Sequence, residues 1–225
     1  MTIDPADRRP AARVDNQDAA LFGQTPSQTV GPFFHYGLPW KGGADLIGAS
    51  GMGARTDLFP PEHDVLNVAV RSGVPNGHVI ELTGRVIDGA GAAVPDAMIE
   101  IWQADSNGRF AGEAGSDPHF VGFGRAATDD DGRYRFRTIL PGRVAGPGGV
   151  PQARHVAMSV FARGLVRRVV TRFYFAATEG LADDPILAMV PAGRRDTLIA
   201  RSTGEGIWSL DLMLQGAGET VFFDL

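Results

Sequence analysis

The stretch Thr83–Phe110, TGRVIDGAGAAVPDAMIEIWQADSNGRF, decides how the chain is expected to fold. It reads as a strand, a glycine-rich turn, a second strand at 97–103 and a polar loop that ends at the ring of Phe110. The Asp88-Gly89 step is typical of the tight turn of a hairpin. Apolar residues that alternate with polar ones between such turns indicate strands with one buried face.

The same pattern recurs on both sides of this stretch. The turn sequence DDDG at 129–132 precedes an alternating run, Arg133–Arg137, and a short helix is expected at 194–201. Further strands are expected at residues 79–86, 155–161, 169–176, 208–215 and 220–223. At least seven short strands separated by turn signals predict an all-β chain, an antiparallel β-sandwich with little helix.

Composition narrows the classes of protein that remain. The 225 residues include no cysteine, which excludes disulfides and thiolate metal sites. The net charge of −5 argues against general nucleic-acid binding. The N-terminal residues lack the apolar core of a signal peptide, and no apolar run approaches the ~20 residues of a membrane span. A cytoplasmic location is therefore expected.

Three regions are expected along the chain. Residues 1–22 are polar and without periodicity, which predicts a disordered N-terminal tail. Residues 23–78 are expected to form an extended arm and an irregular lead-in, because TPSQTVGPFFHYGLPW at 25–40 combines prolines with aromatic residues. Residues 79–225 are expected to form the β-sandwich core.

The residue inventory alone indicates no catalytic centre. No two histidines have the spacing that places both imidazoles on one face of a strand or helix. Nucleophile-elbow, P-loop and dinucleotide-binding motifs are also missing from the sequence. Tyr134 and Tyr174 fall in alternating strands and are predicted to be core residues.

Four stretches, in this order, resemble the intradiol ring-cleaving dioxygenases. They are TPSQTVGPFF at 25–34, IEIWQADSNGRF at 99–110, TDDDGRYRFRTILPGRV at 128–144, and the set FARG, TRFYF and GETVFFDL toward the end. In that family two tyrosines and two histidines hold a ferric ion. The resemblance covers residues 25–225 and implies the sandwich fold of the family.

The chain departs from the family at the metal ligands. Phe110 and Val144 stand where the resemblance implies tyrosines, and Ala157 stands where it implies the second histidine of a His-x-His pair. Of the four positions, His155 alone keeps a donor atom. One imidazole among apolar side chains cannot hold iron. These four positions are therefore interpreted as a vestigial metal site, with no metal bound by this chain.

The resemblance implies a non-iron alpha chain that works with an obligate, iron-bearing beta chain, in a higher alpha–beta oligomer. The complex would open protocatechuate with O2 to 3-carboxy-cis,cis-muconate, in the beta-ketoadipate pathway of aromatic catabolism. Fe(III) is expected on the beta chain, and this chain alone is expected to be inactive, with no catalytic residue. Thr29, Gly31, Pro32 and Arg163 are expected to line the substrate pocket at the subunit interface.

Two alternatives stay open. The chain can be a free-standing β-sandwich that binds or scaffolds without an enzymatic role, because this architecture also serves non-enzymes. A single-chain dioxygenase with another metal set is disfavoured, because no second histidine pairs with His155. Without the resemblance, Phe110 reads as a loop aromatic at the edge of the core, His155 as a structural histidine and Arg163 as a surface charge.

Overall fold

The computed structural model describes residues 43–48, 52 and 73–224. The expected tail at 1–22, the aromatic arm at 25–40 and the pocket residues Thr29, Gly31 and Pro32 lie outside the described residues. Within the described part, the strands are β1 (Val79–Ile87), β2 (Met98–Trp102), β3 (Phe123–Ala127), β4 (Arg133–Ile139), β5 (His155–Phe161), β6 (Val169–Phe175), β7 (Ile199–Gly204), β8 (Ile207–Ser209) and β9 (Leu212–Met213).

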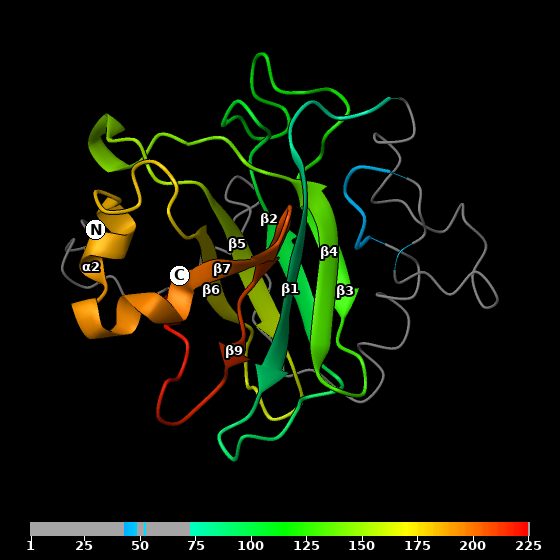
Figure 1. Cartoon of the computed structure of the whole chain (residues 1–225), viewed down its shortest axis with the longest axis vertical. Helices are drawn as coiled ribbons and strands as arrows, with labels where there is room; N and C mark the ends of the chain where they lie inside the picture. Colours follow the sequence, from blue (N-terminus) through cyan, green and yellow to red (C-terminus); the bar gives the residue numbers. More distant parts are fainter. Residues whose placement is uncertain (1–42, 49–51, 53–72, 225) are drawn as a thin grey trace, which may run out of the picture.

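The strands form two layers that face each other (Figure 1). Hydrogen-bonded neighbours follow the order β3-β2-β5-β6-β7-β8-β1-β4, and β9 pairs with β1. β7 joins the two layers, since it pairs with β6 of one and β8 of the other. The all-β fold is confirmed. The division of the chain after residue 78 stays a prediction.

The sheet differs from the expected antiparallel sandwich in one detail, because it is mixed. β6 pairs with β7 in parallel, and β1 pairs in parallel with both β8 and β9. Parallel neighbours need a long crossover. The connection from β6 to β7 provides it, because it runs from Phe175 to Ile199 and carries α2 (Pro185–Met189) and the 3-10 helix η5 (Ala192–Leu198).

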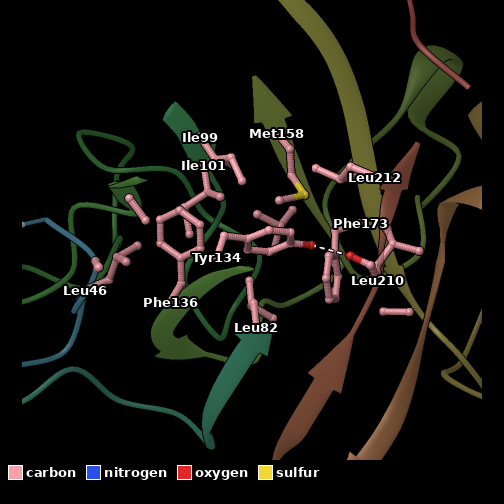
Figure 2. Packing of buried hydrophobic residues seen from close by; sticks show 14 of the residues in the cluster. Leu46, Leu82, Ile99, Ile101, Tyr134, Phe136, Met158, Phe173, Leu210 and Leu212 are labelled. Atoms are coloured by element: carbon pink, nitrogen blue, oxygen red, sulfur yellow. Dashed lines mark hydrogen bonds between the residues drawn. The ribbon is translucent and has the colours of Figure 1, made fainter. Parts of the chain in front are cut away.

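The core lies between the two layers, where alternate side chains of each strand meet (Figure 2). On β1 the even-numbered residues from Ile80 to Val86 are buried, as the alternation predicted. Tyr134 is buried in this core, as predicted, and its hydroxyl donates a hydrogen bond of 2.6 Å to the carbonyl oxygen of Leu210 (Figure 2). Leu46, from the short described segment before β1, packs into the same cluster.

The C-terminal third differs most from the predicted elements. The helix expected at 194–201 is η5 at 192–198, and the residues after it begin β7. The single strand expected at 208–215 is divided into β8 and β9. Residues 220–223 form no named strand, although Phe223 makes an isolated bridge with Val170. No helix in the described ranges is long and apolar enough to cross a membrane.

Candidate functional site

The loop after β2 is organised by the buried carboxylate of Asp105. Its Oδ1 accepts hydrogen bonds from the backbone N–H groups of Asn107 at 2.8 Å and Arg109 at 3.0 Å. Its Oδ2 accepts from the N–H of Asp117 at 2.9 Å. Asp105 thus folds the polar segment of the loop onto one side chain, which fixes where Phe110 is presented.

A second loop, at residues 141–144, is packed tightly against the first. Gly108 has a φ of 78°, and a Cβ atom there would lie 1.9 Å from the carbonyl oxygen of Arg143. The N–H of Gly142 donates to the carbonyl oxygen of Asp105 at 2.7 Å. Only glycine permits this approach at position 108. The contact brings the loops that carry Phe110 and Val144 to the same end of the sheet.

Phe110 and Ala157 are both neighbours of one residue of β2, Trp102. The ring of Phe110 stacks on the indole of Trp102, with ring centroids 5.9 Å apart and planes 2° from parallel. Trp102 is 41% exposed and faces Ala157 across the β2–β5 pair. At two positions where the resemblance implies metal ligands, the structure therefore has the ring of Phe110, stacked on Trp102, and the methyl group of Ala157.

Val144 is buried, and its carbonyl oxygen accepts a hydrogen bond of 2.8 Å from the N–H of Gln152. This bond closes the segment between the second loop and β5, three residues before β5 begins at His155. The structure therefore brings all four vestigial positions to one region of the fold: the two loops and the start of β5.

His155 is held as a neutral structural residue. Its Nδ1 lies 2.8 Å from the carbonyl oxygen of Ala153, and its ring centroid lies 5.6 Å from that of Tyr174. Burial and, to a smaller degree, the positive charge of Arg172 lower the pKa of His155 to about 4. At neutral pH the ring is uncharged, so Nδ1–H donates to the Ala153 carbonyl.

This set of side chains does not fit a ferric ion. Phe110, Val144 and Ala157 offer carbon atoms only, and the one imidazole present is committed to a carbonyl oxygen through one of its nitrogens. Among the residues that the structure describes, no group of three or more His, Cys, Asp or Glu could hold a metal ion. Iron requires several oxygen, nitrogen or sulfur donors at once.

Arg163 lies away from the vestigial site. It follows β5, eight residues beyond His155, which corresponds to roughly 25 Å of extended chain. Its guanidinium forms an ion pair with Asp96, and its side chain is 68% exposed. The structure therefore separates Arg163 from the other four positions and leaves its charge on the surface.

The sequence analysis did not single out Arg172. It faces Ala157 across the β5–β6 pair, and its Nη1 donates hydrogen bonds to Gln152 Oε1 at 2.7 Å and to the Tyr174 hydroxyl at 3.1 Å. The sequence feature that could have identified Arg172 is its charge within TRFYF at 171–175, a strand in which no other residue is charged. Such a residue is expensive to bury unless it is paired or functional.

Comparisons with known proteins agree with this architecture. The family model described as Dioxygenase matches residues 57–206. The protocatechuate 3,4-dioxygenase alpha chain of Pseudomonas putida is 37% identical over 210 residues, which cover 91% of this chain and 98% of that one. The beta chain of the same enzyme from Burkholderia cepacia is 40% identical over 179 residues, 73% of this chain and 76% of its own length.

A solved structure extends the likeness to three dimensions. The structure of catechol 1,2-dioxygenase from Acinetobacter sp. ADP1 inhibited by bound mercury superposes with a TM-score of 0.51 at 26% identity. The alignment covers 89% of this chain and 66% of that one. The overall fold is therefore similar to that of this catechol 1,2-dioxygenase.

Proposed function

This chain belongs to the intradiol dioxygenase family, and we propose that it is the alpha subunit of a protocatechuate 3,4-dioxygenase whose iron is held by a separate beta subunit. The complex inserts both atoms of O2 into protocatechuate and opens the ring between the two hydroxyl groups. Support comes from the match to an alpha chain over nearly the whole length of both proteins. A higher alpha–beta oligomer and a cytoplasmic location are part of the proposal and rest on the family alone.

One observation supports the proposal that the beta subunit, and not this chain, holds the iron. Three of the four positions that the resemblance aligns with metal ligands carry hydrocarbon side chains, and Phe110 is stacked flat on Trp102. The close approach of Gly108 to Arg143 joins the two loops that carry Phe110 and Val144. The Lewis-acid and redox work of ring opening is therefore assigned to iron on the beta subunit.

The contribution proposed for this chain is one wall of the substrate pocket. Arg163 is exposed and held by Asp96, so it can present positive charge to a carboxylate or dianion across a subunit interface. Thr29, Gly31 and Pro32 are proposed to line the same wall on the strength of the resemblance. None of these residues touches the reacting atoms in this proposal. Their proposed role is to bind and orient the substrate.

Co-expression with the iron-bearing beta chain tests this proposal. We expect the two chains to co-elute and to contain iron in proportion to the beta chain. The complex should consume O2 and protocatechuate together, and the chain purified alone should contain no stoichiometric iron and show no activity. A lone chain that binds one iron and cleaves the ring would contradict the proposal, and a failure of the two chains to associate would favour the free-standing module.

A further inference from the structure

A cavity of about 490 Å³ lies between β6, α2 and the C-terminal residues 221–224. In Figure 1, α2 and η5 lie on the side of β6 away from β1 and β4. The lining is mainly apolar and includes Ile186, Val190 and Phe223. A volume of several hundred Å³ with an apolar wall and few polar groups is typical of a site for a small organic molecule.

One cation projects into this apolar lining. Arg172 lines the cavity, and its guanidinium lies 6.0 Å from the ring centroids of both Tyr174 and Phe223. Its two hydrogen bonds to other side chains both come from Nη1 and go to neutral acceptors, the Gln152 amide and the Tyr174 hydroxyl. A guanidinium has five N–H donors, so most of its binding capacity remains unused by these contacts.

The carboxylates around the cavity are already paired with other groups. Asp224 at the rim accepts from Arg167 at 2.9 Å, and both side chains are largely exposed. Asp184 lies behind Tyr174 and accepts four hydrogen bonds, one of them from the Tyr174 hydroxyl. In the described part of the chain no carboxylate forms an ion pair with Arg172. Among the described residues, the guanidinium therefore has no directly paired carboxylate where it faces the cavity.

We propose that this cavity binds a small aromatic carboxylate. The ring lies against the apolar side chains of Ile186, Val190 and Phe223, and the carboxylate accepts hydrogen bonds from Arg172. A planar guanidinium suits a planar carboxylate because it can donate two parallel hydrogen bonds. The site is built from described residues of this chain, and the inference does not depend on the proposed function.

The small side chain of Ala157 keeps part of this space open, since it also lines the cavity. It lies beside Arg172 across the β5–β6 pair. A larger apolar residue at 157 would enter the volume proposed for the ligand without disturbing the core, because Ala157 is on the face of β5 opposite the buried Val156 and Met158. Ala157→Leu therefore tests whether the ligand occupies this space, and Arg172→Gln tests whether the positive charge of Arg172 contributes to binding.

The test is a calorimetric titration of the full-length chain with benzoate. The chain is titrated alone, because the substrate pocket proposed for the alpha–beta complex would itself bind an aromatic carboxylate. We expect one benzoate site per copy of this chain, weakened roughly tenfold to a hundredfold in Arg172→Gln, since a hydrogen bond to a charged group has that effect. Ala157→Leu should weaken it at least about tenfold, as an overfilled pocket does. Arg201→Gln, at an exposed arginine of β7, should leave it unchanged.

Benzamide supplies the matched ligand, with the same ring and no charge, and it should bind far more weakly than benzoate. Circular dichroism of each variant verifies that the sandwich is intact. The proposal is overturned by any of these results: no saturable site for millimolar benzoate on the wild-type chain, equal affinity in a folded Arg172→Gln variant, or equal affinity for benzamide. Unchanged binding in Ala157→Leu would place the benzoate elsewhere and overturn it as well.

Discussion

The hydroxyl of Tyr174 donates a hydrogen bond of 3.0 Å to Oδ1 of Asp184, which ties β6 to the start of α2. The same oxygen caps the helix by accepting from the N–H groups of Ile186 and Leu187. Oδ2 accepts from the N–H of Ala153 at 2.7 Å, two residues before β5. One buried carboxylate thus holds together the walls of the cavity and the segment that positions His155.

Replacing Asp184 by alanine should lower stability by roughly 2–4 kcal/mol, because the change removes a helix cap and leaves buried donors without a partner. Thermal unfolding of the purified protein measures the effect. The exposed neighbour Asp183 provides the matched control, and Asp183→Ala should leave the melting temperature nearly unchanged. Equal melting temperatures for the two variants would show that the network contributes little.

Gly84 in β1 should not tolerate a side chain. A Cβ atom there would lie 1.9 Å from the Leu210 carbonyl oxygen and 2.7 Å from the Tyr134 hydroxyl, so it would break the bond between them. Gly84→Ala should cost about 3 kcal/mol or more by overpacking and by loss of this buried hydrogen bond. Urea denaturation tests it against Gly204→Ala in β7, where the nearest atom is 3.5 Å away and little change is expected.

His155 should make the chain sensitive to mild acid. Its pKa of about 4 in the folded chain lies below the ordinary value of 6.5, so the unfolded chain binds more protons between these values. The stability that the neutral ring contributes is therefore present above pH 6.5 and is lost as the pH falls toward 4. Between pH 7 and pH 5 the expected loss is about 2 kcal/mol.

The comparison variant is His155→Asn, whose amide N–H group stands near the position of Nδ1 and can donate to the Ala153 carbonyl, and which does not titrate. Urea denaturation midpoints of both proteins at pH 7 and pH 5 separate this contribution from that of the carboxylates, which both proteins share. The wild-type protein should lose more stability than the variant on acidification. Parallel losses would mean that the folded ring takes up a proton as readily as the unfolded one.

Much of the fold was predictable because one strand face is buried and the other is not. The alternation in β1, β4 and β5 gave the strands and their inward faces, and both Tyr134 and Tyr174 are buried as expected. The two short strands β8 and β9 were predicted as one strand. Periodicity does not reveal that the backbone of Leu210, between them, forms hydrogen bonds with the Tyr134 hydroxyl and the Thr83 carbonyl oxygen.

The helix α2 was missed because its signal is short. Five residues give too little periodicity, and the Asp184-Pro185 step that begins it is also typical of a turn. For the candidate site, the sequence predicted that the positions aligned with metal ligands lack donor atoms, because Phe110, Val144 and Ala157 have hydrocarbon side chains. The role of Arg172 was not predictable, because it depends on the pairing of β5 with β6 and on the C-terminal segment that closes the cavity.

Arg163→Ala should raise the KM for protocatechuate roughly tenfold to a hundredfold in the alpha–beta complex, because a charged hydrogen-bonding group is lost from the pocket wall. The iron content should not change, since the iron is assigned to the beta chain and Arg163 pairs only with Asp96 among the ion pairs of the described residues. Stability should fall by less than about 1 kcal/mol, because the pair is exposed. Steady-state kinetics with iron analysis measures all three effects, with Arg163→Lys expected to recover part of the affinity. Arg201→Ala removes a surface arginine elsewhere and should leave KM unchanged, and an equal rise in both variants would attribute the effect to net charge and remove Arg163 from the pocket.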